Sequence, residues 1–190
     1  MGGKVVRIAL AGEGGQGVQS IAEIITEAAF NEGKEALYCP NFGLEQRGGV
    51  SIAFVQIGDS RIGAPKFKTG DIFIALSLRA IKRCRQYIGP ETTLVYDSSI
   101  VGAEAEVPPN AARVMAIPAI QRSKEELHPR VFNIVIMGAV IGATGVVTME
   151  QAREALEAKL GGKFKQNPDL RELNYRALEM GRDLIGKSGE

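Results

Sequence analysis

The sequence has few of the side chains that bind metal clusters. Its 190 residues include two cysteines, Cys39 and Cys84, and one histidine, His128. An Fe–S cluster or a structural zinc site is held by about four thiolate or imidazole ligands, so this chain alone supplies neither. We therefore expect that difficult redox chemistry does not take place on this chain.

A long apolar run and an excess of one charge are also missing. The most membrane-like stretch, residues 131–147, is uncharged for 17 residues but contains an asparagine and three glycines. It is shorter and more polar than the roughly 20 apolar residues of a membrane span, so we interpret it as a buried helix. The 23 basic and 22 acidic residues give a net charge of +1. This balance argues against a nucleic-acid binder that acts through bulk positive charge.

No secretory signal is visible at the amino end of the sequence. We therefore expect a cytoplasmic protein with no membrane and no nucleic-acid partner. Its two thiols should then be reduced and unpaired.

Short β-rich runs alternate with helical patterns along the first two thirds of the chain. Apolar residues on one face predict a helix over residues 15–32, with Gly33 after its end. Residues 61–62 are predicted to return as a hairpin partner of strand 50–57, and residues 104–110 to form an irregular connector. The predicted strands cover residues 4–11, 35–39, 50–57, 72–76, 93–96 and 114–117, with a basic helix over 78–87.

The last third of the sequence is helical in character. A helix is predicted over residues 133–145, and Thr148 to Gln151 form a capping box for the next helix. Asn167 and Pro168 then introduce a terminal helix with one apolar stripe. The whole pattern predicts one domain over residues 1–190, of α/β class. We expect a Rossmann-like, doubly wound, mostly parallel sheet with a helical carboxy-terminal layer.

The segment from Gly12 to Gly17 reads Gly-Glu-Gly-Gly-Gln-Gly and matches G-x-G-x-x-G between a predicted strand and a predicted helix. In that context the helix N-terminus presents free N–H groups to an anion. A dinucleotide site also needs an acid at the end of the second strand, but Glu32 and Glu35 lie before that strand or at its start. Glu13 inside the loop also repels a pyrophosphate. NAD or FAD binding is therefore disfavoured, and glycines that serve packing alone remain an alternative.

A second glycine-rich segment, residues 40–49, reads Pro-Asn-Phe-Gly-Leu-Glu-Gln-Arg-Gly-Gly. In a doubly wound sheet it leaves the carboxyl end of the second strand, so we expect it beside the first glycine loop. Glu45 and Arg47 could form a local ion pair worth under about 1 kcal/mol. The alternative is a loop that presents Arg47 to a phosphate or to a partner subunit.

Together these segments resemble the gamma subunit of 2-oxoacid:ferredoxin oxidoreductases, the family that acts on pyruvate, 2-oxoglutarate and ketoisovalerate. The resemblance covers nearly the whole chain, and the motifs are specific in combination rather than singly. It is carried by Gly12 to Val18, Pro40…Phe42-Gly43…Glu45…Arg47-Gly48-Gly49, Asn133…Met137-Gly138-Ala139 and Asn167…Asn174…Ala177-Leu178…Gly181.

The resemblance implies a multi-subunit enzyme that oxidatively decarboxylates a 2-oxoacid with coenzyme A to an acyl-CoA, CO2 and reduced ferredoxin. Alpha and beta subunits, with a delta subunit in some cases, would hold thiamine diphosphate, Mg²⁺ and Fe–S clusters. The gamma chain would hold no such cofactor and no catalytic residue, and would help to shape the coenzyme A side. The residues expected near a coenzyme A phosphate or a subunit contact are Gly12, Gly14, Gly15, Gln16, Gly17 and Arg47.

The form of the glycine loop slightly favours 2-oxoglutarate as the substrate, although substrate contacts are expected to belong largely to other chains. Three alternatives remain open: the beta-type subunit of an indolepyruvate ferredoxin oxidoreductase, a free-standing Rossmann-like nucleotide-binding module, and a purely architectural subunit.

The remaining polar residues are not assigned to the predicted ligand site. Asn133 and Asn174 are interpreted as structural links, and His128 and Cys39 are given no role. The basic residues of the predicted helix 78–87 form either a solvated face or a docking strip for acidic ferredoxin or coenzyme A phosphates. They are Arg79, Lys82, Arg83 and Arg85.

Overall fold

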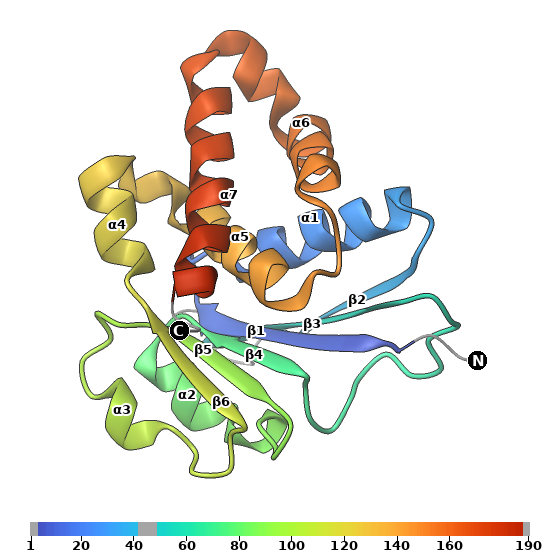
Figure 1. Ribbon diagram of the computed structural model, residues 1–190, viewed down its shortest axis with the longest axis vertical. Helices are drawn as coiled ribbons and strands as arrows, with labels where there is room; N and C mark the ends of the chain where they lie inside the picture. The colour runs from blue at the N-terminus through green and yellow to red at the C-terminus, as the bar shows by residue number, and fades with distance from the viewer. Residues whose placement is uncertain (1–3, 42–48, 188–190) are drawn as a thin grey trace.

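The computed structural model describes residues 4–41 and 49–187, which form a six-stranded sheet covered by helices on both faces (Figure 1). The strand order is β2-β3-β1-β4-β5-β6. β1, β4, β5 and β6 run parallel, and β3 is antiparallel to both of its neighbours, β1 and β2. The predicted mostly parallel α/β fold is therefore confirmed. The strands are β1 Val6–Glu13, β2 Glu35–Asn41, β3 Val50–Gly58, β4 Ile72–Ala75, β5 Thr93–Asp97 and β6 Arg113–Ile117.

The position of β3 differs from expectation. The hairpin predicted between residues 50–57 and 61–62 is wrong, since no strand forms over residues 61–70. Both edges of β3 are already hydrogen-bonded, one to β2 and the other to β1, so no edge remains for a third partner. Because β3 lies between β1 and β2, the second strand of the chain is not adjacent to the first.

Helices cover the two faces of the sheet unequally (Figure 1). Side chains alternate along β1, so Ile8 and Leu10 join the larger apolar cluster and Ala9 and Ala11 join the smaller one. The larger cluster is covered by α1 Val18–Asn31, α4 Ala119–Glu126, α5 Phe132–Thr144, α6 Met149–Gln166 and α7 Asp169–Lys187. The smaller is covered by α2 Leu78–Arg83, by the 3-10 turn η1 Arg85–Tyr87 and by α3 Ala103–Glu106.

Two sequence-based boundaries on the smaller face need correction. The basic helix predicted over residues 78–87 ends at Arg83 and continues as the separate turn η1 after Cys84. The connector predicted as irregular contains α3, a helix of four residues.

Only one of the two hydrogen bonds of the predicted capping box forms at the start of α6. The backbone N–H of Gln151 donates to Thr148 Oγ1 at 3.2 Å, as expected. The N–H of Thr148, however, donates to Glu32 Oε1 at 2.6 Å instead of to Gln151. A carboxylate from the end of α1 therefore replaces the local amide, and α6 is tied to α1.

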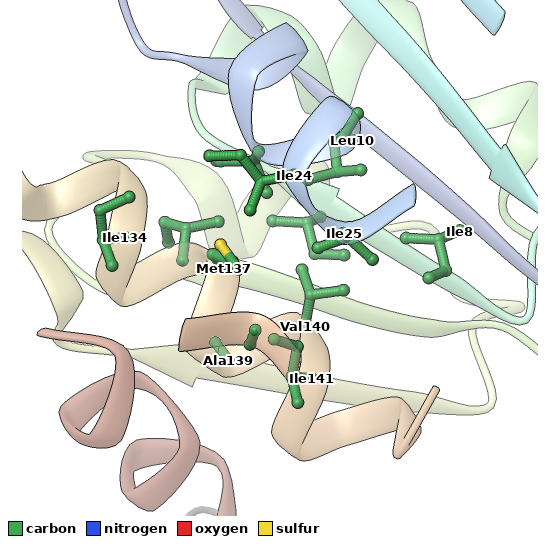
Figure 2. Packing of buried hydrophobic residues seen from close by; sticks show 14 of the residues in the cluster. Ile8, Leu10, Ile24, Ile25, Ile134, Met137, Ala139, Val140 and Ile141 are labelled. Carbon is green, nitrogen blue, oxygen red and sulfur yellow. The ribbon is translucent and has the colours of Figure 1, made fainter. Parts of the chain in front are cut away.

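α5 is buried along most of its length, as predicted for the uncharged stretch. Figure 2 shows Met137 and Val140 of α5 packed with Ile25 of α1 and Ile8 of β1. Among the described residues no helix combines the length and the apolar character needed to cross a membrane.

α7 packs on the opposite side of α5 through glycines. A Cβ atom on Gly138 would lie 2.0 Å from the carbonyl oxygen of Leu178, and one on Gly181 would lie 1.9 Å from that of Val135. Real Cβ atoms do not approach backbone this closely, so both positions require glycine while the two helices keep this separation. The interface is therefore built by direct contact of two helix backbones.

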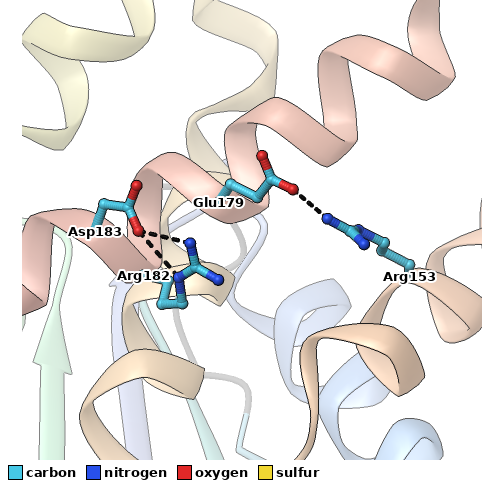
Figure 3. A network of polar contacts seen from close by, with 4 residues as sticks. All are labelled: Arg153, Glu179, Arg182 and Asp183. Atoms are coloured by element: carbon cyan, nitrogen blue, oxygen red, sulfur yellow. Dashed lines mark hydrogen bonds and ion pairs between the residues drawn. The ribbon is translucent and has the colours of Figure 1, made fainter.

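Ion pairs add to the attachment of the carboxy-terminal helices. Arg153 of α6 pairs with Glu179 of α7, and Arg182 pairs with its neighbour Asp183 (Figure 3). Lys159 of α6 pairs with Glu23 of α1 at 2.8 Å. These side chains are largely exposed, so each pair contributes under about 1 kcal/mol, and the apolar and glycine contacts dominate.

We predict that Gly138→Ala lowers the free energy of unfolding by about 1–3 kcal/mol or more, because the new methyl group forces α5 and α7 apart. Urea denaturation of the full chain measures this effect. Gly162→Ala is the matched control, since Gly162 lies within α6 with no described heavy atom near its added Cβ. The control should be stabilised by about 0.5–1 kcal/mol. Equal effects of the two substitutions would show that the crossing tolerates a side chain.

Candidate functional site

The glycine loop connects the carboxyl end of β1 to α1, as predicted, and its glycines serve different purposes. A Cβ on Gly12 would lie 2.7 Å from Gln16 Oε1 and 3.1 Å from Leu76 Cβ, so a side chain here would displace the Gln16 amide. Gly15 and Gly17 have φ angles of +90° and +79°, which L side chains rarely adopt. Gly14 is exposed, and no described heavy atom lies within 4 Å of its added Cβ. Backbone at Gly14 and Gly15 is therefore open to a ligand.

α1 starts directly after this loop with free N–H groups. Gly17 is its N-cap residue, no side chain of the described residues caps the helix, and its first turn contains no acid. The N-terminus of a helix carries a partial positive charge and unpaired N–H groups, both of which attract anions. This end of α1 can therefore receive a phosphate or a carboxylate, with the carboxylate of Glu13 opposing it.

Gln16 binds protein backbone on both sides of its amide. Its Nε2 donates to the carbonyl oxygen of Leu76 at 2.8 Å, and its Oε1 accepts from the N–H of Glu13 at 2.7 Å. The side chain thus joins the end of β1 to the residue that follows β4.

Gln16 bridges the two strands, β1 and β4, at which the chain changes from one face of the sheet to the other. β1 leads to α1 on one face of the sheet, whereas β4 leads to α2 on the other. In α/β sheets such a reversal marks the edge, at the carboxyl ends of the two strands, where ligands commonly bind. Gln16 braces that edge, a role that no local motif in the sequence indicates, because Leu76 is 60 residues away.

Asn133, at the start of α5, lies against the glycine loop. A Cβ on Gly17 would be 2.9 Å from Asn133 Cβ and 3.1 Å from its Nδ2. The contact with Gly17 therefore supports the structural interpretation of Asn133. Asn174 is buried, and its Nδ2 donates to the carbonyl oxygen of Leu170 in its own helix at 2.6 Å, so it does not link α7 to another element through this bond.

A polar network that the sequence did not reveal attaches α1 to the edge of the sheet. Gln19 Nε2 donates to Ser51 Oγ at 2.6 Å and to the carbonyl oxygen of Ile52 at 3.1 Å. The hydroxyl of Tyr38 donates to Gln19 Oε1 at 2.6 Å. Partial burial raises the pKa of Tyr38, and the nearby carboxylate of Glu23 adds to this shift. The network joins α1, β2 and β3 near the carboxyl end of β2.

The second glycine segment is described only at its ends. Residues 42–48, with Glu45 and Arg47, lie outside the described residues, so the role of Arg47 stays a prediction. At the far end of the segment Val50 pairs with Glu13 of β1, which brings the start of β3 beside the glycine loop. β2 itself is separated from β1 by β3.

The other candidate residues have local structural roles. Glu106 of α3 pairs with Lys82 at 3.2 Å and with Arg85, so two of the four basic residues help to hold α3 in place. Cys84 is buried, which raises the pKa of its thiol to about 12. His128 accepts a hydrogen bond from the N–H of Arg130. Within the described ranges no group of three or more His, Cys, Asp or Glu side chains is arranged to hold a metal ion.

Comparison with known proteins gives consistent matches. A model of the family described as pyruvate ferredoxin/flavodoxin oxidoreductase matches residues 7–184. The chain is 33% identical over 178 residues to ketoisovalerate oxidoreductase subunit VorA of Methanothermobacter thermautotrophicus, a match that covers 93% of this chain and 35% of VorA. It is 32% identical over 184 residues to 2-oxoglutarate synthase subunit KorC of the same organism, and this match covers 94% of both chains. The chain therefore spans about a third of VorA and nearly all of KorC.

Two solved structures have the same fold. One is the gamma subunit of a keto/oxoacid ferredoxin oxidoreductase from Geobacter sulfurreducens, with a TM-score of 0.80, 29% identity and coverage of 97% of this chain and 98% of that chain. The other is a 2-oxoglutarate:ferredoxin oxidoreductase from Magnetococcus marinus with 2-oxoglutarate, coenzyme A and succinyl-CoA bound. Its TM-score is 0.87 at 27% identity, over 97% of this chain and 31% of that one. These matches confirm the resemblance predicted from the sequence.

We predict that Gln16→Ala lowers the free energy of unfolding by about 1–3 kcal/mol, because it removes both hydrogen bonds that join the end of β1 to the residue after β4. Gln16→Glu should also destabilise, since a carboxylate can still accept from the N–H of Glu13 but cannot donate to the carbonyl of Leu76. Gln166→Ala, at the exposed end of α6, is the matched control. Urea denaturation that gives the same value for Gln16→Ala and the control would contradict the bracing role.

Proposed function

Since the chain belongs to the pyruvate ferredoxin/flavodoxin oxidoreductase family, we propose that it is the gamma-type subunit of a 2-oxoacid:ferredoxin oxidoreductase. The complex would decarboxylate a 2-oxoacid oxidatively, transfer the acyl group to coenzyme A and pass the electrons to ferredoxin. The match covers nearly all of KorC and of the Geobacter gamma subunit, which supports a gamma-type subunit. In VorA the matching part is about a third of a longer protein.

The reactive groups of this complex would belong to its other subunits. Thiamine diphosphate, Mg²⁺ and the Fe–S clusters are assigned to alpha, beta or delta chains, in agreement with the small number of cysteines in this one. The high pKa of Cys84 argues against that thiol as a nucleophile. The chain would therefore contribute binding and shape and would be inactive alone.

The observation that carries a ligand role is the uncapped N-terminus of α1 behind the exposed backbone of Gly14 and Gly15. We assign this anion-receptive loop to a phosphate of coenzyme A, with Gly12 and Gly17 shaping it, and we keep Arg47 as a second candidate ligand. Gln16 would contribute by fixing the loop rather than as its main donor. Coenzyme A is bound in the Magnetococcus enzyme, 31% of which matches 97% of this chain.

A free-standing dinucleotide-binding module is less well supported. β2 ends in Cys39-Pro40-Asn41 and is separated from β1 by the antiparallel β3, so the paired strands that place a ribose-binding carboxylate beside the glycine loop are not formed. The matches to VorA and KorC also favour the 2-oxoacid enzymes over the indolepyruvate type. 2-Oxoglutarate is the first substrate to assay, with ketoisovalerate and pyruvate next.

The proposed assembly predicts which proteins accompany this chain. A tagged copy of the full chain, isolated from its native source, should bring down the subunits that bind thiamine diphosphate. Mass spectrometry of the isolated material identifies them. Recovery of the chain alone as a stable monomer would count against the assembly.

The proposed coenzyme A contact predicts a selective kinetic effect in the assembled enzyme. Gly14→Asp places a negative charge on the loop, so the KM for coenzyme A should rise about tenfold or more while the KM for the 2-oxoacid changes little. Gly162→Asp adds the same charge on α6 and should leave both constants unchanged. Arg47→Ala tests the second ligand in the same assay. A KM for coenzyme A that does not respond in an intact complex would remove the tested residue from the site.

A further inference from the structure

A concave site lies at the opposite end of β1 from the glycine loop. It is a cavity of about 470 Å³ with Val5, Arg7 and Gln56 on the sheet side. Residues of segment 61–69 close the other side. Arg7 and Gly14 are seven residues apart along an extended strand, so the two sites are separated by about 20 Å.

The cavity forms where the sheet has no helix over it. Arg7 follows the same alternation as Ala9 and Ala11, which belong to the smaller apolar cluster. α2 and α3 cover this face farther along the sheet, whereas residues 61–69 pass over its end as an irregular segment (Figure 1). The floor is thus a rigid sheet and the wall a single stretch of chain.

That stretch is fixed to the core at several points. The buried side chain of Gln56 donates from Nε2 to the carbonyl oxygen of Ala64 at 2.6 Å. The ring of Phe67 packs edge-on against Phe54, with 5.3 Å between the ring centroids. After it, the N–H of Gly70 donates to the carbonyl oxygen of Tyr87 at 2.9 Å. The cavity is therefore largely pre-formed, as small-molecule sites usually are.

All charged residues that line the cavity are positive. Four of its residues are cationic and none is acidic: Arg7, Arg61, Lys66 and Lys68. Within the described ranges none of the four makes an ion pair, although Lys66 Nζ lies 5.7 Å from the centroid of the Phe54 ring. The carboxylate of Asp71, which directly precedes β4, accepts from the N–H of Arg7 at 2.7 Å, and Asp71 does not line the cavity. Such a concentration of positive charge raises the local concentration of anions.

We propose that this cavity binds a small phosphate-bearing polyanion, with one or two linked phosphate groups among the four cations. Its volume lies within the roughly 300–1,000 Å³ of small-molecule sites. Arginine pairs with phosphate through two parallel hydrogen bonds, and lysine adds a mobile point charge. A concave site with an anchored wall fits a compact ligand better than the surface of an acidic protein. Because the site lies at the far end of β1, its ligand does not compete for the glycine loop.

Titration calorimetry of the full chain with inorganic pyrophosphate at low salt tests the proposal. Lys66→Gln/Lys68→Gln should weaken pyrophosphate binding about tenfold or more, since it removes two of the four charges. Lys163→Gln/Lys165→Gln is the matched control, because these exposed lysines have the same spacing near the end of α6. The control should bind pyrophosphate like the unmodified chain, and Gly14→Asp should keep the binding that Lys66→Gln/Lys68→Gln removes.

Each other outcome overturns the proposal. If pyrophosphate does not bind, the site is excluded. If both double variants weaken pyrophosphate binding equally, the binding comes from the overall charge of the protein and not from this cavity. Loss of binding in Gly14→Asp instead assigns pyrophosphate to the glycine loop. Release of partner subunits by Lys66→Gln/Lys68→Gln, with pyrophosphate binding unchanged, assigns the face to a protein interface. The KM for coenzyme A in the complex tests the glycine loop separately, so the two proposals can fail independently.

Discussion

The close packing of α5 is the constraint on which the rest of the structure depends. One side of this helix meets α1 and β1 through large apolar side chains, and the other meets the backbone of α7 through Gly138 and Gly181. The helix has no room to shift in either direction, because protein interiors are densely packed. Its first turn also carries Asn133, which lies against Gly17. α7 fixes α5, and α5 in turn contacts the glycine loop through Asn133. The carboxy-terminal layer therefore sets the position of the glycine loop through α5.

The carboxyl ends of β1 and β4 are braced by the protein itself. In many α/β folds this place receives the ligand directly, but here both hydrogen bonds of the Gln16 amide go to backbone. The loop is consequently held in one shape before any partner arrives, and less conformational entropy is lost when an anion binds. This arrangement fits the proposed role of a subunit that supplies a fixed surface to an active site whose reactive groups come from other chains.

Two ends of one strand then carry two different anion-directed features. At the carboxyl end of β1 the attraction comes from backbone N–H groups and a helix terminus, and at its amino end from arginine and lysine side chains. The first kind of site recognises a single phosphate at short range, whereas the second acts over a longer range and weakens with salt. A rigid central strand keeps them about 20 Å apart.

Local pattern and residue chemistry were enough to predict the strands, α1 with its closing Gly33, the buried α5 and the place of the glycine loop. These features depend on neighbours in the sequence, and so does the family resemblance. The insertion of β3 between β1 and β2, the missing hairpin and the partners of Gln16, Gln19 and Thr148 were decided by the tertiary structure. Strand order and side-chain partners join residues that are tens of positions apart, such as Gln16 and Leu76, and no local period encodes them. The sequence by itself determined the kinds of elements and the chemistry of the loop, and three-dimensional packing decided which groups remain free to bind.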